Sequence, residues 1–460
     1  MEAPPLTRWS RTLGRPTRSR LVALTLAGGL ASMLLGATRP NRSSPPLLGA
    51  GLLGNQTTLA AVSPDAAAGA AYVPGSTVLR LADGRLRHLP PGAAEPVTVA
   101  ADDPAALAAV ARERAWLAAG TVPGAAAERE AAAASLLFLR LLVRPGGAAL
   151  AAQTPYWAYV WPRDASFVAA ALAVTGHRAE AAAILGFLAR SQRPDGTWPA
   201  RCHPDGRPVT DGRPSQLDAT GWVPWAAWLA SDQGRDRPLA ARLWPTVRAA
   251  ADVAAGSLDA TGLPPAGADY WERREHAPTL GTAAALRVGL RAAARLAGRL
   301  GDAGRQAAWS RAAGRLDRAV RERFGPTGYQ RHPHGGGPDA AVAWLAPPFA
   351  PPDPAVRAAV AAAWRRLGAG GGAVPGRPWL GSDPWTPATA SFALAAMAGG
   401  DRPAAEARLA WLLDHRTALG AFPERVAHDD GAPRSVAPLA WTHAIVLLTL
   451  VSREGRVPTP

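Results

Sequence analysis

Apolar residues recur at helical spacing through most of the chain. From residue 126 onward, alanine- and leucine-rich stretches of helical length alternate with loops rich in glycine and proline. This pattern is typical of helices that bury one or more faces and are separated by turn-forming residues. It predicts about twelve helices: 127–144, 164–175, 178–192, 216–231, 238–255, 279–299, 302–323, 339–346, 353–367, 385–399, 402–415 and 436–452.

These helices fall into hairpin-like pairs joined by loops of unequal length. We therefore expect an all-α fold, an (α/α)6 barrel in which six helix pairs form a toroid with an inner and an outer ring. We place this barrel at residues 126–452. Its cleft should lie at one end, lined by the longer loops 145–163, 193–215, 256–278, 368–384 and 416–435.

The pattern changes before residue 126. Residues 71–125 contain short β-like pieces and a helix near 104–119, which predicts a small N-terminal strap packed on the barrel. Residues 41–70 are rich in Pro, Gly, Ser and Ala, so we expect a flexible linker there. The barrel should thus carry only a short N-terminal extension with a little β structure.

The first 40 residues have the organisation of an export signal. Several arginines precede an apolar run at 21–37, which is typical of a signal peptide or a signal-anchor. Since arginines favour the cytoplasmic side, everything after residue 40 should lie outside the membrane. We expect an exported protein that is secreted or attached to the membrane through residues 21–37. The alternative is a leader whose apolar stretch is accidental.

Composition excludes several classes of function. The net charge is +15, but every basic side chain is arginine and the arginines are scattered, which disfavours a nucleic-acid surface. Cys202 is the only cysteine, so an intrachain disulfide and a cysteine-based zinc site are excluded. His332 and His334 lack a third ligand at regular spacing. We expect a monomer without cofactor or metal.

Two glutamates have surroundings that suit cleavage of a glycosidic bond. Glu272 follows Trp271, and Glu424 lies two residues after Phe422. Glycoside hydrolysis needs one carboxylic acid to protonate the leaving oxygen and a second carboxylate to activate water or attack the sugar. An indole beside Glu272 would partly desolvate its carboxyl and favour the neutral form that a general acid needs.

Aromatic and polar side chains at the start of the helix near 164–175 suit sugar binding. Tyr159 and Trp161 offer flat apolar faces, and Arg163 and Asp164 offer a donor fork and an acceptor for hydroxyl groups. The alternative is structural: Asp164 as a helix N-cap beside a buried aromatic plug. The helix near 216–231 carries Trp222, Trp225 and Trp228 on one face, which is more typical of a core than of a binding platform.

Together these clusters resemble the glucoamylase-like family of glycoside hydrolases, family 15. The matching motifs occur in the family's order and span residues 126–452. They are Tyr159-Val-Trp-Pro-Arg-Asp164, Gln216-Leu-Asp-Ala-Thr-Gly221, Asp269-Tyr-Trp-Glu272, Trp385-Thr-Pro387, Phe422-Pro-Glu424 and Pro438-Leu-Ala-Trp-Thr-His-Ala444.

The resemblance implies an inverting exo-hydrolase that releases glucose from the non-reducing end of α-glucosides. On this analogy Glu272 is the general acid and Glu424 the general base. The family commonly has a second acidic residue after the acid, where this chain has Arg273. The implied substrate-binding residues are Tyr159, Trp161, Arg163, Asp164, Asp218, Trp271, Arg273, Trp385 and Trp441.

Two other interpretations stay open. A non-catalytic carbohydrate-binding barrel at the cell surface would bind oligosaccharide without turnover. A terpene-cyclase-like barrel would explain the single repeat-like segment around 186–198, but the chain has no Asp-x-Asp-Asp acid motif. The sequence does not separate α-1,4, α-1,6 and α,α-1,1 glucosides as substrates.

Overall fold

The computed structural model describes residues 48–55, 57–233, 236–376 and 381–460. The expected leader and its apolar run at 21–37 lie outside this part of the chain. Within the described part, no helix combines the length and the apolar character needed to cross a membrane. Export and membrane attachment therefore stay predictions.

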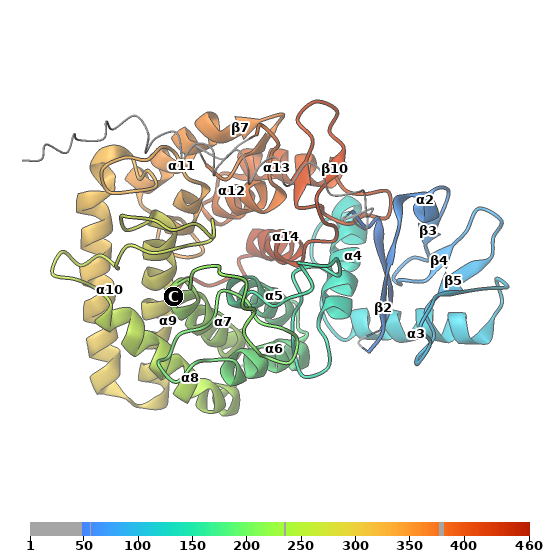
Figure 1. Cartoon of the computed structure of the whole chain (residues 1–460), viewed down its shortest axis with the longest axis horizontal. Coiled ribbons are helices and arrows are strands. Elements are labelled where there is room, and N and C mark those ends of the chain that lie inside the picture. The colour runs from blue at the N-terminus through green and yellow to red at the C-terminus, as the bar shows by residue number, and fades with distance from the viewer. Residues whose placement is uncertain (1–47, 56, 234–235, 377–380) are drawn as a thin grey trace, which may run out of the picture. The chain divides into compact units, whose positions relative to one another are not determined.

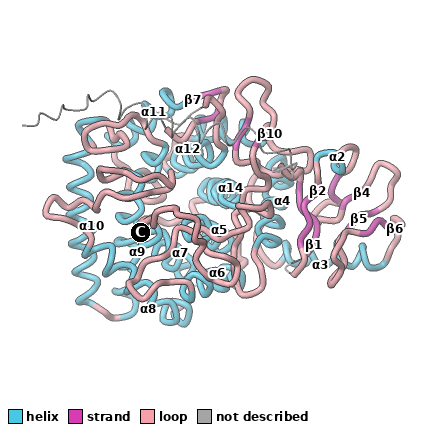
Figure 2. The backbone as a smooth tube through the Cα atoms, in the orientation of Figure 1, coloured by secondary structure: helices cyan, strands magenta, loops and turns pink. Residues whose placement is uncertain are grey.

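The described chain begins with a β-containing extension, which Figure 1 shows beside α4 (Ala126–Leu142). Figure 2 shows that most of the strands gather there. The extension comprises hairpin β1 (Gly51–Gly54) and β2 (Leu59–Val62), helix α2 (Pro64–Ala67), an antiparallel sheet in the order β3 (Ala71–Tyr72), β4 (Leu79–Arg80), β5 (Leu86–His88), β6 (Val97–Val99), and helix α3 (Pro104–Ala118).

The expectation of a flexible linker at 41–70 is wrong for the residues that the structure describes. Residues 48–70 contain β1, β2 and α2 rather than an extended tether. Leu52 is fully buried in the same hydrophobic core as the helical ring. The Tyr72 hydroxyl also bonds both the backbone N–H and the carbonyl of Leu52, each at 2.8 Å. The sequence did not reveal these strands because they are rich in Gly and Ala and contain few large apolar residues. Those few residues are nevertheless enough to anchor the strands.

The remainder folds as an (α/α)6 toroid, as expected. Its inner ring consists of elements that each contact the next, with the last returning to the first. In ring order they are α5 (Pro162–Val174), α7 (Ala219–Gln233), α9 (Leu280–Leu300), the 3-10 helix η2 (Ala340–Leu345), α12 (Thr386–Ala398) and α14 (Ala440–Arg453).

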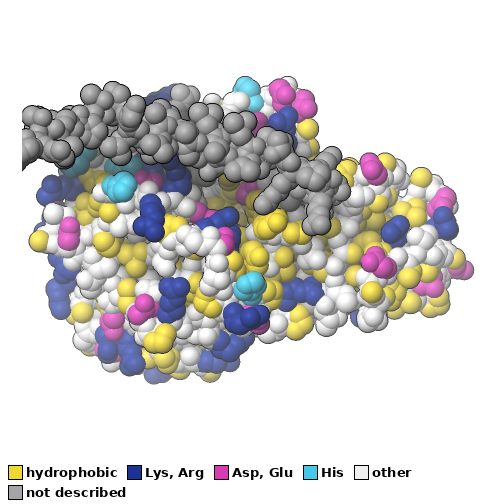
Figure 3. All heavy atoms as spheres, in the orientation of Figure 1, with side chains coloured by type: hydrophobic (Ala, Val, Ile, Leu, Met, Phe, Trp, Pro, Cys, Tyr) yellow, Lys and Arg dark blue, Asp and Glu magenta, His cyan; other side chains and the backbone are white. Residues whose placement is uncertain are grey.

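Six outer helices cover this ring, each next to an inner partner. They are α4, α6 (Arg178–Arg190), α8 (Arg237–Gly256), α10 (Ala303–Arg323), α11 (Pro354–Leu367) and α13 (Arg402–Asp414). Figure 3 shows arginine side chains along the edge formed by α10 and α8, with acidic side chains among them. The inner helix α5 is instead buried along its whole length. A helix without a polar face is stable only inside a core.

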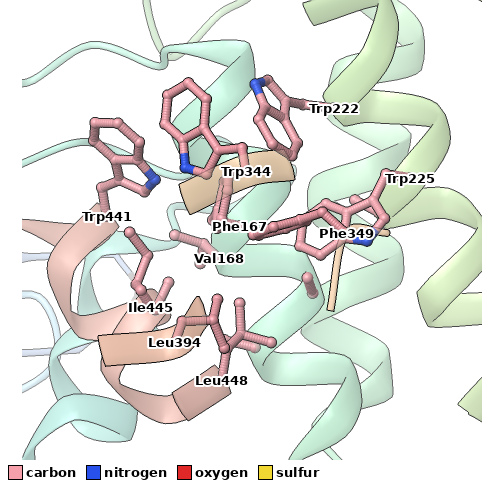
Figure 4. Packing of buried hydrophobic residues seen from close by; sticks show 14 of the residues in the cluster. Phe167, Val168, Trp222, Trp225, Trp344, Phe349, Leu394, Trp441, Ile445 and Leu448 are labelled. Atoms are coloured by element: carbon pink, nitrogen blue, oxygen red, sulfur yellow. The ribbon is translucent and has the colours of Figure 1, made fainter. Parts of the chain in front are cut away.

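The centre of the ring is filled by aromatic side chains. Figure 4 shows Phe167, Trp222, Trp225, Trp344 and Phe349 packed together. Their rings meet mostly edge to face, with centroids 4.9–6.0 Å apart, a favourable geometry for aromatic pairs. The tryptophans of α7 are thus core residues, as their helical spacing predicted.

Two glycines let the inner helices α7 and α9 approach closely. A Cβ atom on Gly221 would lie 2.0 Å from the carbonyl oxygen of Ala285, and one on Gly289 would lie 2.4 Å from the Cα of Gly221. Any side chain at either position would therefore push the helices apart. The contact fixes the start of α7, and with it the position of Asp218 just before the helix.

The loops differ in length between the two ends of the ring. Connections from an inner element to the next outer helix are short, such as 175–177 and 399–401. Connections from an outer helix to the next inner element are long: 143–161, 191–218, 257–279, 324–339, 368–385 and 415–439. All long loops therefore meet at the N-terminal end of the inner ring. Two of them carry the short strand pairs β7 (Gly368–Ala369) with β8 (Gly372–Ala373), and β9 (Arg425–Val426) with β10 (Pro433–Arg434).

Candidate active site

The candidate glutamates lie on two of the long loops at this end of the ring. Glu272 belongs to the loop before α9, and its backbone has a φ of 57°, in the left-handed region. Non-glycine residues adopt this conformation rarely, so its presence beside a polar cluster suggests a functional constraint. The backbone N–H of Glu272 donates to the Asp269 carbonyl at 2.8 Å and closes a tight turn.

The carboxyl of Glu272 is held from two sides. The Trp161 indole N–H donates to Oε1, and the Arg213 guanidinium donates to Oε2. We expected Trp271 to be the indole beside this carboxyl. The indole that donates to it is that of Trp161, while Trp271 packs against Arg331, whose guanidinium lies 3.6 Å from the centre of the Trp271 ring.

Glu424 lies on the loop before α14 and is held by neutral donors. The Ser435 hydroxyl donates to Oε2, and the Trp157 indole donates to Oε1 at 3.4 Å. Burial raises the pKa of Glu424 above its ordinary value, and the nearby charge of Glu272 raises it further. The donors Ser435 and Trp157 oppose this shift without reversing it.

The two carboxyls belong to one site. Trp157 and Trp161 lie on the same loop before α5, and each donates its indole N–H to a different one of the two glutamates. The negative charge of Glu272 is also close enough to Glu424 to raise the pKa of the second carboxyl. Folding therefore brings together two acids that are 152 positions apart in the chain (424 minus 272).

A buried arginine lies beside this pair. The guanidinium of Arg163 bonds Asp164 at 3.1 Å, Gln216 at 2.9 Å and Asp218 at 3.2 Å, and it lies 4.9 Å from the ring centre of Trp441. Burial raises the pKa of Asp164 to about 6, partly offset by the charge of Arg163, while the charges of Glu272 and Asp218 raise it further. Asp164 thus lies within electrostatic range of Glu272.

The alternative in which Asp164 caps the helix is wrong. Helix α5 begins at Pro162, and its N-cap residue is Trp161, so Asp164 lies inside the first turn. Pro162 explains the earlier start, because proline is well accommodated in the first turn of a helix. The carboxyl of Asp164 bonds Arg163 instead of the helix backbone.

The other predicted site residues differ in how close they lie to the carboxyl pair. Tyr159 and Trp161 enclose the buried Arg201, whose guanidinium lies 5.3 and 5.2 Å from their ring centres. Trp385 precedes α12, with the guanidinium of Arg425 at 5.8 Å from its ring centre. Arg273 is exposed, and its side chain makes no hydrogen bond or ion pair with the described residues. The structure thus groups the predicted residues around the carboxyl pair, with Arg273 on the outer surface of the acid loop.

An ion cluster centred on Arg331 holds the loop that carries Glu272, and sequence reasoning missed it. Arg331 bonds Asp269 at 2.9 Å and Glu275 at 2.7 Å, which lie on either side of Glu272, and Asp339 at 2.6 Å. His332 also contacts Glu275 at 3.0 Å. The charge run 272–275 could have signalled that a partner was needed, but nothing in the sequence identified Arg331.

Three further residues that the sequence did not single out contact the carboxyls: Trp157, Arg213 and Ser435. Trp157 lies within the aromatic run 156–161, so that run was a usable signal. Arg213 and Ser435 lie in loops without a recognisable pattern. Among the described residues, no group of three His, Cys, Asp or Glu side chains could hold a metal ion.

Comparison with solved structures identifies the fold. A glycosidase crystallised as a glutamate-to-alanine variant in complex with glucose superposes with a TM-score of 0.61 at 24% identity, over 70% of this chain and 96% of that chain. A bacterial glucoamylase complexed with acarbose gives 0.61 at 17% identity, over 76% and 59%. The glucoamylase from Saccharomycopsis fibuligera gives 0.57 at 14% identity, over 68% and 89%.

No family model matches the chain, and no curated protein matches it in sequence. The likeness is therefore one of structure. The chain has the fold of glucoamylase-like glycosidases, which are (α/α)6 barrels, and its candidate carboxyl pair lies at the loop end of that fold.

Proposed function

We propose that this protein is an inverting glycoside hydrolase that releases glucose from the non-reducing end of α-glucosides. One observation carries the proposal: neighbouring indoles of a single loop, those of Trp157 and Trp161, each hold one of the two carboxyls, Glu424 and Glu272. Two carboxyls that face one sugar from opposite sides are the machinery of glycoside hydrolysis. The glucoamylase fold and a structural neighbour that binds glucose support the choice of substrate.

In this mechanism Glu424 acts as the general base. It takes a proton from water, and the water oxygen attacks the anomeric carbon on the face opposite the leaving group. Glu272 protonates the glycosidic oxygen as that bond breaks. The α-glucoside thus yields β-glucose and a free alcohol, and proton exchange with solvent resets both carboxyls. Inversion requires the carboxyl groups to stand roughly 6.5–9.5 Å apart, so that the water fits between them.

The buried polar cluster suits the closed end of the sugar pocket. Arg163 and Asp164 would bond hydroxyl groups of the terminal glucose, with Gln216 and Asp218 fixing the guanidinium in place. Trp441 lies against Arg163 and would provide an apolar face for the ring. Because these groups are enclosed, a chain end fits this site better than the middle of a polysaccharide.

The decisive experiment is a panel of maltose, isomaltose, trehalose and dextrin, with the anomer of the released glucose followed by NMR. We expect β-glucose as the first product. Release of α-glucose would contradict the inverting mechanism. Glu272→Gln and Glu424→Gln should each lower kcat by about 10²–10⁴-fold, because each removes one partner in proton transfer. Activity within a few-fold of wild type in either variant would mean that the other carboxyls of the site do the chemistry.

A non-catalytic sugar-binding barrel is the second candidate. The observation that favours it is the ion pair between Arg213 and Glu272, because that contact must open before the carboxyl can protonate a leaving group. This candidate predicts that calorimetry detects binding of the same oligosaccharides while NMR detects no hydrolysis over days.

A further inference from the structure

Arg213 lies on the solvent side of Glu272. Its side chain is 41% exposed, whereas that of Glu272 is 18% exposed and that of the enclosed Arg163 is 6% exposed. Arg213 is therefore the exposed partner of the Glu272 carboxyl, whereas Arg163 is enclosed. In an exo-acting pocket the cleaved sugar occupies the closed end, so the leaving group must lie on the side where Arg213 is found.

A second arginine lies close to the first. Arg201 is only 5% exposed and pairs with Asp211, the same carboxylate that Arg213 approaches at 3.4 Å. Burial lowers the pKa of Arg201, and the nearby charge of Arg213 lowers it further. One carboxylate thus serves two arginines, and Glu272 supplies the second negative charge.

The pairing of two arginines with two carboxylates does not persist when Glu272 is protonated for catalysis. A general acid must carry its proton when it meets the leaving oxygen, and the carboxyl of Glu272 is then neutral. Arg201 and Arg213 are left facing the single negative charge of Asp211. The nearby Asp269 and Glu275 bond Arg331 rather than Arg201 or Arg213. Arg213 consequently loses the charged partner that it has while Glu272 is ionised.

We infer that Arg213, with Arg201 behind it, binds a carboxylate on the leaving group, so that the preferred substrates are α-glucosides with an acidic aglycone. This inference rests on the proposed function. A substrate carboxylate would replace Glu272 as the partner of Arg213, because Arg forms strong two-point hydrogen bonds to carboxylates. Substrate binding would then release Glu272 from its ion pair and give Arg213 a new carboxylate partner in the same step.

The test uses two open-chain derivatives of maltose that differ in charge. Maltitol ends in a neutral alcohol and maltobionate ends in a carboxylate, while the glucosyl unit and the bond to be cleaved are the same. We expect kcat/KM to be at least ~10-fold higher for maltobionate at low salt, and the difference to shrink as salt is added. If the enzyme cleaves isomaltose instead, the corresponding pair from isomaltose applies.

Arg213→Gln should bring the two kcat/KM values to within about two-fold of each other, mainly by lowering the value for maltobionate. Arg207→Gln is the matched control, since Arg207 lies on the same loop, is exposed, and among the described residues forms an ion pair with Asp205 alone, at 2.7 Å. That control should keep the preference of the wild type.

Each outcome is decisive. Equal kcat/KM values for the two compounds in the wild type, or an equal loss for both in Arg213→Gln, would overturn the acidic subsite while leaving hydrolysis of maltose intact. Failure of the wild type to cleave any glucoside would instead overturn the proposed function, and this inference with it. Thermal unfolding of both variants shows whether they are folded.

Discussion

The two carboxyls of the site differ in the groups that hold them. Glu424 accepts hydrogen bonds from a hydroxyl and an indole, which are neutral, whereas Glu272 accepts from an indole and a guanidinium. Neutral donors compensate only part of the cost of burying a charge, and the pKa of Glu424 is raised accordingly. A base with a raised pKa is stronger, but it also becomes protonated at a higher pH.

Ser435→Ala should therefore shift the acidic limb of the pH profile. Glu424 must be ionised to activate water, so kcat/KM falls as the pH drops through its pKa. The Ser435 hydroxyl lowers that pKa, and its removal raises it. The acidic limb, already above the ordinary value of 4.5 for a glutamate, should move to still higher pH, while kcat/KM at the optimum stays within a few-fold of wild type.

The profile of kcat/KM against pH, measured on one substrate, checks this prediction. Ser257→Ala is the control, because that hydroxyl bonds the Ala254 carbonyl at the end of α8 and lies on another loop. A limb that stays in place or moves to lower pH in Ser435→Ala would show that another group governs the acidic limb.

At the scale of elements, the loop before α9 needs an external support. It holds Glu272 in the left-handed region, which costs of order 1 kcal/mol or more for a non-glycine residue. Arg331 bonds Asp269 and Glu275, so both sides of the strained residue are tied to one buried guanidinium. If Glu272 is the acid, as proposed, Arg331 is a positioning residue that acts on it through the backbone of its loop.

Glu275→Gln tests this support. The substitution removes the charge that pairs with Arg331 and His332 but keeps the size of the side chain. We expect kcat to fall roughly 10-fold because the acid is aligned less often. KM should change little, since Arg163 and Asp164, the residues proposed to bind the terminal sugar, lie outside this loop.

Steady-state kinetics separates the two parameters, and Glu322→Gln, an exposed glutamate of α10, is the control. A rise in KM with an unchanged kcat would contradict the positioning role and would place Glu275 in sugar binding instead.

The sequence predicted the helical elements well because their signals are local. Proline within the first turn and an aspartate before it mark the starts of α8, α11 and α13, where Asp236, Asp353 and Asp401 cap the helix. The exception is η2, expected as an ordinary helix and found as a 3-10 helix. Local pattern cannot distinguish the two when the segment is only six residues long.

The site was less accessible to sequence reasoning because its contacts are long-range. Glu272 and Glu424 were found from their aromatic neighbours, but the indoles that actually bond them come from the loop before α5. Arg331 lies 56 positions from Glu275, and nothing in either segment indicates the pairing. A loop arginine such as Arg213 acquires its role only when folding places it beside a particular carboxyl.

At the scale of the whole described molecule, the N-terminal extension supports the loop that carries Glu424. Leu48 pairs with Ala437 as an isolated bridge, and the Thr417 hydroxyl donates to the Ala50 carbonyl. Leu419 belongs to the small hydrophobic core of the extension. Both ends of the loop 415–439 therefore contact the extension, so the extension and the ring should unfold together.

A pair of glycine substitutions tests this coupling. A Cβ atom on Gly51 would lie 2.3 Å from the Tyr72 hydroxyl and 3.1 Å from Leu419, so Gly51→Ala must push the hairpin from its partners. We expect a loss of about 1–3 kcal/mol. Gly314→Ala in α10 meets open space and should stabilise the protein by about 0.5–1 kcal/mol, because alanine favours a helix.

Calorimetric unfolding distinguishes the possibilities. For a chain of this size 1 kcal/mol corresponds to a shift in Tm of about 1 °C, so Gly51→Ala should lower and Gly314→Ala should raise the same single transition. A separate early transition in Gly51→Ala, with the main one unmoved, would show that the hairpin unfolds on its own. The loop that carries Glu424 would then owe its position to the ring alone, and Gly51→Ala should retain full activity at temperatures between the two transitions.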